Sequence, residues 1–443
     1  MVRTCGASLL DETEVGHYKA LAHIFHPVHL FHWMSRQKRS QPAAAPTDVR
    51  RSPVGAAEGC DLFRYDTHHL FPVLLSELPM SAVTRAAVEA VLSQYTDPYL
   101  NQDPVSAGCV KHIEIVGDRV NVQLEIGYAA GLFKSGWAQL LQLAIENLDG
   151  VTIARVEVNS VIAAHKAQAQ IPGLANVKNV VAVASGKGGV GKSTTAANLA
   201  LALAREGAKV GILDADIYGP SQGIMFGIPE RTRPEVKDQK WFVPLKAHGV
   251  EVMSMAFLTD DNTPMVWRGP MVSGALLQLV TQTAWGDLDY LVIDMPPGTG
   301  DIQLTLAQKV PVAGAVIVTT PQDLALLDAR KGVEMFRKVN IPVLGVVENM
   351  AVHICSNCGH AEHLFGEGGG EKLATQYGVE LLASLPLSML IREQADGGKP
   401  TVIAEPDSQI AMVYQELARH VGARIVLQEA ATPAMPNISI SDD

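Results

Sequence analysis

Residues 186–193 read Gly-Lys-Gly-Gly-Val-Gly-Lys-Ser, which satisfies the whole pattern G-x-x-x-x-G-K-[ST]. The apolar run Val180–Ala184 precedes this segment and the helical pattern Ala196–Ala204 follows it, which is the strand–loop–helix context that a phosphate loop requires. Glycines allow consecutive backbone N–H groups to point inward, and the start of the helix adds partial positive charge. The segment therefore predicts an α/β fold that binds nucleotide phosphates.

The residue types of this loop predict ATP and Mg²⁺ as ligands. We expect Lys192 to reach the β- and γ-phosphates and the Ser193 hydroxyl to bind Mg²⁺. The alternative is the dinucleotide fingerprint G-x-G-x-x-G, with Asp214 holding a ribose. A dinucleotide site requires neither Lys192 nor Ser193, so the phosphate-loop interpretation is favoured. The residues expected to contact the nucleotide in the loop are Gly186, Lys187, Gly188, Gly189, Val190, Gly191, Lys192, Ser193 and Thr194.

Two further apolar runs end in carboxylates, where parallel sheets bind their ligands. Val210–Leu213 leads into Asp214 and Asp216, and Tyr290–Ile293 leads into Asp294. Asp294 fits the Walker-B position, which holds Mg²⁺ directly or through water, and Asp216 is a candidate for orienting the attacking water. For each aspartate taken alone, a helix cap or a turn is the alternative role.

Short apolar runs alternate with helical stretches over residues 178–428. Continuous apolar strands separated by helices predict a doubly wound, mainly parallel sheet with both faces covered, the P-loop NTPase architecture. Residues 80–160 contain an alternating hairpin, a helix with its apolar face over Trp137–Leu148 and a third strand at Val151–Val158, so we expect a small α+β domain there. Residues 161–177 are small and polar and are expected to form a linker.

Both ends of the chain lack a globular pattern. Residues 1–79 hold seven of the fourteen histidines and the Pro/Arg-rich segment Gln41–Pro53, and we interpret them as a disordered extension rather than a metal tract. One hypothesis is that Met80 is the natural first residue of the protein. Residues 429–443 combine proline with acidic residues and are expected to form a disordered tail.

Charge and cysteine content narrow the function classes. The chain has 35 basic and 46 acidic residues, a net charge of −11, which gives no support to nucleic-acid or anionic-membrane binding. No apolar run is long enough for a membrane helix, and no signal peptide pattern is present. The chain has five cysteines, which is a small and odd number and does not suit a disulfide framework, so a cytoplasmic location is expected. We expect Cys109 to be a structural thiol.

The pair Cys355-x-x-Cys358 has the spacing at which two thiolates face one metal centre. Three interpretations remain open: a zinc knuckle completed by neighbouring histidines, a redox disulfide, and an iron–sulfur site. No other cysteine is close in sequence. A dimer would complete a four-thiolate set by contributing Cys355 and Cys358 from each subunit.

Lys187 inside the loop gives the deviant Walker A signature, and the segment resembles the SIMIBI-type ATPases, which include MinD, ParA and the nitrogenase iron protein. This resemblance implies that Lys187 reaches the nucleotide of a partner subunit in a homodimer. Together with the loop, five further segments resemble the Mrp/ApbC family of iron–sulfur cluster carrier ATPases: Leu213–Ser221, Val266–Pro270, Asp294–Asp301, Val347–Met350 and Cys355–Cys358.

The Mrp/ApbC resemblance implies a [4Fe-4S] cluster bridging the dimer at Cys355 and Cys358, received from an assembly scaffold and passed to apo-proteins under control of ATP. The candidate catalytic residues are Lys192, Asp216 and Asp294 from the phosphate-loop pattern and Lys187 from the SIMIBI resemblance. Asn349 is a candidate adenine contact, with a turn asparagine as its alternative. The family's Asp-Pro-Glu motif reads Asp97-Pro98-Tyr99 here, which puts the role of that glutamate in doubt. The rival functions are a MinD/ParA-like scaffold with structural zinc and a cluster-bearing reductase.

Overall fold

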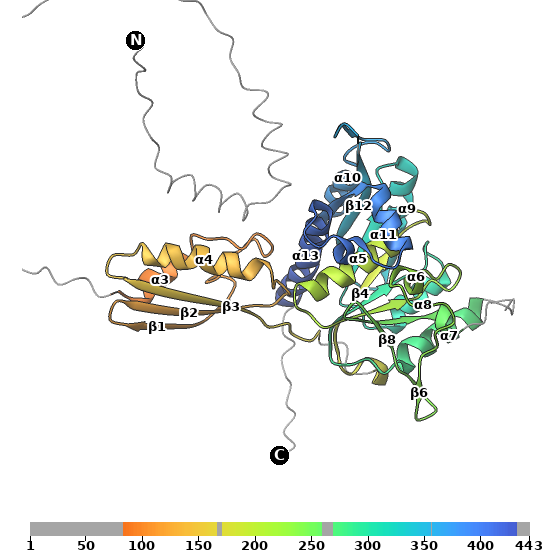
Figure 1. Cartoon of the computed structure of the whole chain (residues 1–443), viewed down its shortest axis with the longest axis horizontal. Helices are drawn as coiled ribbons and strands as arrows, with labels where there is room; N and C mark the ends of the chain where they lie inside the picture. Colours follow the sequence, from red (N-terminus) through yellow and green to blue (C-terminus); the bar gives the residue numbers. More distant parts are fainter. Residues whose placement is uncertain (1–82, 166–170, 259–268, 356, 432–443) are drawn as a thin grey trace, which may run out of the picture. The chain divides into compact units, whose positions relative to one another are not determined.

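The computed structural model describes residues 83–165, 171–258, 269–355 and 357–431 (Figure 1). The expected extension 1–79, most of the Val266–Pro270 motif and residues 432–443 lie outside the described residues. The expected tail begins too early, because the last helix, α13, continues through Ala431.

Residues 85–160 form the small α+β domain that the sequence predicts. Its sheet has the order β1–β2–β3, with β1 and β2 antiparallel around Gly117 (φ 63°) and β2 and β3 parallel. The third strand begins two residues later than predicted, because the Val151 N–H is still bonded to Leu148 after the second helix. In chain order the elements are α3 (Arg85–Leu92), β1 (Val110–Val116), β2 (Arg119–Ile126), α4 (Phe133–Glu146) and β3 (Ile153–Ser160).

The Asp97-Pro98-Tyr99 turn of this domain is buried. Asp97 accepts hydrogen bonds from the backbone of Tyr99 and Leu100 and from the Tyr128 hydroxyl (2.7 Å). Tyr99 is 4% exposed, and the guanidinium of Arg419 in α13 lies over its ring at 5.2 Å. At the position of the family glutamate, this chain therefore has an aromatic side chain with a packing role.

The remaining described residues form a larger α/β domain that contains the phosphate-loop segment. The predicted apolar strands are all present, and α5 begins earlier than predicted because Gly191 is its N-cap. The elements are η2 (Pro172–Leu174), β4 (Val177–Ala184), α5 (Lys192–Arg205), β5 (Val210–Asp214), α6 (Gln222–Met225), β6 (Val236–Lys237), β7 (Trp241–Phe242), β8 (Leu245–Ala247), β9 (Val250–Ser254), η3 (Met255–Phe257), α7 (Gly269–Gln282), β10 (Leu288–Asp294), α8 (Asp301–Lys309), β11 (Gly314–Thr319), α9 (Asp323–Lys338), β12 (Val343–Ile354), β13 (Ala361–Glu362), α10 (Gly369–Tyr377), β14 (Glu380–Leu387), α11 (Met389–Asp396), α12 (Thr401–Ala404) and α13 (Gln409–Ala431).

The central sheet is mainly parallel and doubly wound, as predicted. Its order is β13–β12–β11–β4–β10–β5–β9–β8, and β14 pairs with β12. Antiparallel pairing is confined to the margins, at β12–β13 and β8–β9. The chain crosses from β4 to β5 in one direction and from β10 through β11 to β12 in the other, so right-handed connections place α5 on one face and α8 and α9 on the opposite face. In keeping with this arrangement, α13 packs on α5 and α10 packs on α9.

This strand order determines where the functional segments meet. β4, β10 and β5 are adjacent and parallel, and Asp294 pairs in register with Val183 on one side and Asp214 on the other. All three strands end at the same edge of the sheet, so the loop after β4 and the carboxylates after β5 and β10 converge there. None of the described helices is both long and apolar enough to cross a membrane.

Candidate functional site

The phosphate loop connects β4 to α5, and its glycines serve two different purposes. At Gly186 a Cβ atom would overlap the backbone of Asp328, so packing excludes any side chain. Gly189 and Gly191 have φ values of 82° and 81°, in the left-handed region that glycine adopts without strain. A Cβ at Gly188 or Gly189 meets nothing within 4 Å. One side of the loop is thus fixed against α9, and the other is open for phosphates.

Alanine substitutions at Gly186 and Gly188 separate these two purposes. We expect Gly186→Ala to lower the free energy of unfolding by about 1–3 kcal/mol or more, because overpacking against backbone cannot be relieved by a rotamer change. Gly188→Ala is the matched control, and its unfolding free energy is expected to stay within about 0.5 kcal/mol of wild type. Urea unfolding of the nucleotide-free proteins measures both values. Equal losses in the two variants contradict this assignment.

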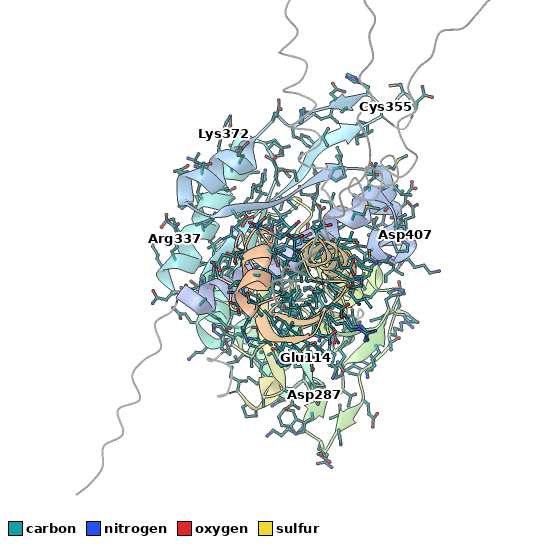
Figure 2. The ribbon with its side chains drawn as sticks, turned by 90° about the vertical axis from the view of Figure 1, so that its left-hand side faces the viewer. Glu114, Asp287, Arg337, Cys355, Lys372 and Asp407 are labelled. Atoms are coloured by element: carbon teal, nitrogen blue, oxygen red, sulfur yellow. The ribbon has the colours of Figure 1, made fainter. Side chains whose placement is uncertain are left out.

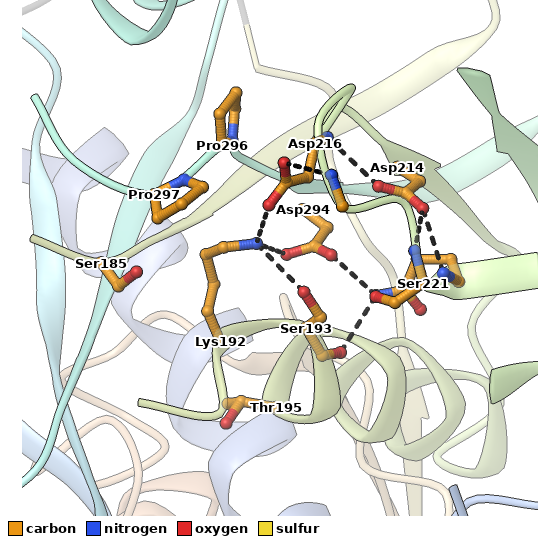
Figure 3. Close-up of polar contacts among 12 residues, drawn as sticks. Ser185, Lys192, Ser193, Thr195, Asp214, Asp216, Ser221, Asp294, Pro296 and Pro297 are labelled. Atoms are coloured by element: carbon orange, nitrogen blue, oxygen red, sulfur yellow. Dashed lines mark hydrogen bonds and ion pairs between the residues drawn. The ribbon is translucent and has the colours of Figure 1, made fainter. Parts of the chain in front are cut away.

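Lys192, at the first position of α5, is the centre of the polar cluster in Figure 3. Its ammonium is buried, forms an ion pair with Asp294 and donates to the Ser193 hydroxyl at 3.1 Å. The Asp216 carboxylate lies 4.0 Å away. The structure therefore brings together Lys192, Ser193, Asp216 and Asp294, which the sequence placed at three separate strand ends.

Asp214 is fully buried and organises the segment that follows β5. Its carboxylate accepts hydrogen bonds from the backbone N–H groups of Asp216, Ser221 and Gln222 and from the Ser254 hydroxyl. Burial, and then the negative charge of Asp294, raises the pKa of Asp214 to about 7. Four donors of this chain occupy the Asp214 carboxylate, so the ribose contact of the dinucleotide alternative has no support among the described residues.

Asp216 stands at the rim of the cluster, 9% exposed. One of its oxygens accepts from the Gly219 N–H at 3.2 Å, and the other faces Lys192. A carboxylate that faces the phosphate-loop lysine from the sheet edge is suitably placed for the predicted role at an attacking water. That role stays a prediction.

Gln222 and Ser254 belong to the cluster but were missed by sequence reasoning. Gln222 is 0% exposed, and its Nε2 donates to the Ser193 carbonyl at 3.0 Å and to Asp294 at 2.8 Å. Neither residue carries a charge or lies in a recognised motif position. The only available signal was that Gln222 directly follows the Leu213–Ser221 segment.

The residues present fit a magnesium ion. Ser193 and Asp294 supply a hydroxyl and a carboxylate, hard oxygen donors of the type Mg²⁺ prefers. Two carboxylates, Asp216 and Asp294, face the single ammonium of Lys192, so negative charge is in excess. In addition, the buried Oε1 of Gln222 has no hydrogen-bond partner among the described residues.

The other predicted loop residues have distinct surroundings. Val190 is buried, and Thr194 lies in the first turn of α5, where its carbonyl accepts from Asn198. The Lys187 carbonyl accepts from the Ser185 hydroxyl at 2.9 Å. Within the described part of the chain, the Lys187 ammonium has no hydrogen-bond or ion-pair partner, and its role at a partner subunit stays a prediction.

Asn349 lies inside β12, which continues through Ile354, so the turn alternative is wrong. Its side chain is 8% exposed and donates to the Val190 carbonyl of the phosphate loop at 2.9 Å. The next residue, Met350, has φ 57°, an unusual value for a non-glycine residue in a strand. The adenine contact stays a prediction, and the observed contact is with the loop.

Cys355 and Cys358 lie in the short connection between β12 and the antiparallel β13. Figure 2 shows Cys355 at the periphery of the fold. The connection is closed by two backbone bonds, Cys355 N–H to the His360 carbonyl and Gly359 N–H to the Cys355 carbonyl, both 2.9 Å. Cys355 is half-buried and Cys358 is exposed. Backbone N–H groups of Cys358 and Asn357 and the Cys358 thiol donate to the Cys355 sulfur and lower its pKa, which favours the thiolate that binds metals.

Among the described residues, the side chains of the zinc-knuckle alternative are not gathered around one metal position. Nδ1 of His353 faces the Leu387 carbonyl at 3.3 Å, and Nδ1 of His363 faces the Ala351 carbonyl at 2.8 Å. Across the described ranges, no three His, Cys, Asp or Glu side chains are arranged to hold one metal ion. Cys109, by contrast, is buried, and burial raises the pKa of its thiol to about 11, as suits a structural thiol.

Two family profiles match this chain. The profile of a ParA family described as "NUBPL iron-transfer P-loop NTPase" matches residues 176–422, more than half of the chain. A second profile, described as "Iron-sulfur cluster assembly protein", matches residues 85–158.

Individual relatives carry related names. An iron–sulfur cluster carrier protein of Pseudomonas fragi is 89% identical over 63% of this chain and 97% of its own length. One of Escherichia coli K12 is 49% identical over 79% of this chain and 94% of its own. Among solved structures, a nucleotide-binding protein from Archaeoglobus fulgidus in complex with ADP is 40% identical, has a TM-score of 0.48, and aligns over 54% of this chain and 93% of that one. The chain belongs to the family of NUBPL-type iron-transfer P-loop NTPases, as the Mrp/ApbC resemblance of its motifs indicated.

Proposed function

We propose that this protein is an ATP-dependent carrier of [4Fe-4S] clusters that acts as a homodimer. The observation that carries the proposal is the course of β12. This strand contacts the phosphate loop through Asn349 and then leads directly into Cys355. The strand β12 therefore connects the proposed nucleotide site to a thiolate pair whose first member, Cys355, lies six residues after Asn349.

The nucleotide half of the proposal is supported by the charge arrangement around Lys192. When ATP binds, the Lys192 ammonium exchanges Asp294 for the β- and γ-phosphates. Asp294 and Ser193 would then hold Mg²⁺. When bound, this ion would neutralise negative charge on the phosphates. Asp216 orients the attacking water, and Lys187 reaches the nucleotide of the partner subunit.

The cluster is the cargo of the protein rather than its resident cofactor. Each chain offers two thiolates at Cys355 and Cys358, and a [4Fe-4S] cluster takes four, so two copies complete the ligand set. The position of the pair on an exposed connection gives an acceptor protein access to it. In transfer, thiolates of the acceptor replace those of the carrier, and no electron needs to move.

The partners and location follow from this chemistry. The protein receives its cluster from an assembly scaffold and delivers it to apo-proteins. Free cluster exchange between thiolates needs a reducing compartment, so we place the protein in the cytoplasm. The net charge of −11 supports neither nucleic acid nor an anionic membrane as a partner.

A transfer assay with a coupling variant tests the proposal. The protein is loaded with iron and sulfide without oxygen, and the activation of an apo-enzyme that needs a [4Fe-4S] cluster is followed with Mg²⁺–ATP or with EDTA. We expect the wild-type transfer rate to change several-fold with Mg²⁺–ATP. In Asn349→Ala, which removes the contact of β12 with the phosphate loop, cluster loading is expected to persist while the response to ATP is lost.

Two results contradict the proposal. One is bound zinc without sulfide after reconstitution, which moves the protein to the scaffold class. The other is a cluster that stays bound through redox cycles and never activates the acceptor, which indicates a reductase.

A further inference from the structure

Gln222, the first residue of α6, contacts the phosphate loop, the Walker-B strand and the end of β5. Its Nε2 donates to the Ser193 carbonyl at 3.0 Å and to Asp294 Oδ2 at 2.8 Å. Its backbone N–H donates to Asp214 at 3.0 Å. Figure 3 shows Ser193 and Asp294, the two expected Mg²⁺ ligands, together beside Lys192.

The orientation of the Gln222 amide is determined by these partners. A backbone carbonyl and a carboxylate both accept hydrogen bonds, so the NH₂ end of the amide must face them. The Oε1 end therefore points elsewhere. It is inaccessible to solvent and has no hydrogen-bond partner in the described part of the chain.

A buried acceptor without a donor costs free energy, so each such atom in a native protein calls for a specific donor, such as an ordered water, a ligand or water bound to an ion. A residue that only held the Asp294 carboxylate in place would need one hydrogen-bond donor and no acceptor. The orphaned oxygen lies on the same amide that holds a carboxylate and the backbone of a hydroxyl ligand, which is the arrangement of a residue that orients metal ligands.

We propose that Gln222 positions the Mg²⁺ of the Mg²⁺–ATP complex without coordinating it. Nε2 fixes the Asp294 carboxylate, and Oε1 accepts a hydrogen bond from a donor that arrives with the metal, a metal-bound water being the donor of that chemistry. Gln222 is thus a positioning residue that acts through Asp294 and Ser193. The inference rests on the proposed nucleotide function.

The test measures metal dependence of binding rather than turnover. A fluorescent ATP analogue is titrated with wild-type protein and with Gln222→Met, a change close in volume, at a series of Mg²⁺ concentrations and in EDTA. We expect affinity in EDTA to be unchanged within about twofold. We expect the Mg²⁺ concentration at half-maximal tightening to rise about 10- to 100-fold, the usual effect of removing an outer partner of a metal ligand.

Two further proteins keep the result interpretable. Gln415→Met makes the same change at a buried glutamine of α13 whose Nε2 donates to Pro406, and it should leave the Mg²⁺ midpoint unchanged. Gln222→Asn retains both amide atoms and serves if the Met variant does not fold, with the same rise expected because the amide no longer reaches Asp294. An unchanged midpoint in a folded Gln222 variant overturns the inference alone. If the wild-type protein shows no Mg²⁺-dependent nucleotide binding, the proposed function is overturned, and this inference fails with it.

Discussion

Lys192→Ala is expected to abolish ATP hydrolysis, with a loss of at least about 10²- to 10³-fold in turnover. A preorganised cation at the transferred phosphate is lost, and removal of one such group typically costs this much. The same change leaves Asp294, which is 0% exposed, without its cation. Breaking a buried ion pair from one side costs about 3–5 kcal/mol, so we also expect a lower free energy of unfolding. Phosphate release and urea unfolding measure the two effects.

The two effects of Lys192→Ala can be separated with a second substitution. In Lys192→Ala/Asp294→Asn the uncompensated carboxylate is removed, so most of the lost stability should return while hydrolysis stays absent. Lys187→Ala is the matched control for loss of a loop lysine, since its ammonium pairs with no described residue. Its stability should equal that of wild type and only hydrolysis in the dimer should fall. A loss of hydrolysis by Lys192→Ala smaller than about 10²-fold, or equal destabilisation by both single changes, contradicts this account.

Cys355→Ser/Cys358→Ser is expected to reduce bound iron and acid-labile sulfide to background after reconstitution. Serine preserves the size of the side chain but offers no thiolate, and the low pKa of Cys355 that favours metal binding is lost with the sulfur. Because both residues lie on an exposed connection, the thermal unfolding midpoint of the metal-free protein should not change. Iron and sulfide analysis, with the visible absorbance of the cluster, is the measurement.

Cys109→Ser is the matched control for the cysteine pair. Its thiol is buried in the small domain and its pKa is raised to about 11, so it is not a ligand in this account. This variant should retain full iron and sulfide content, with any loss confined to stability. If the double variant still binds iron with matching sulfide, the cluster belongs to another site. The same conclusion follows if Cys109→Ser binds neither iron nor sulfide.

Local sequence patterns predicted much of the fold. The strand–loop–helix around residues 186–193, the six apolar strands and the small α+β domain are all present. Parallel strands with both faces covered by helices read as continuous apolar runs, and this made them recognisable. Asn349 shows where such reasoning failed. The pattern ended its strand at Val347, but β12 continues through Ile354 because β13 and β14 pair with its second half. Pairing partners distant in sequence leave no local signal.

By itself the sequence determined which chemical groups the site contains, because a phosphate loop, strand-end carboxylates and a C-x-x-C pair are recognisable from residue type and spacing alone. Only the tertiary structure decided how they are used. The order β4–β10–β5 puts Lys192 against Asp294. Burial in that edge raises the pKa of Asp214 and makes a neutral residue, Gln222, part of the site. Hydrogen-bond direction and desolvation depend on neighbours in space, which residues far apart in the chain supply only after it has folded.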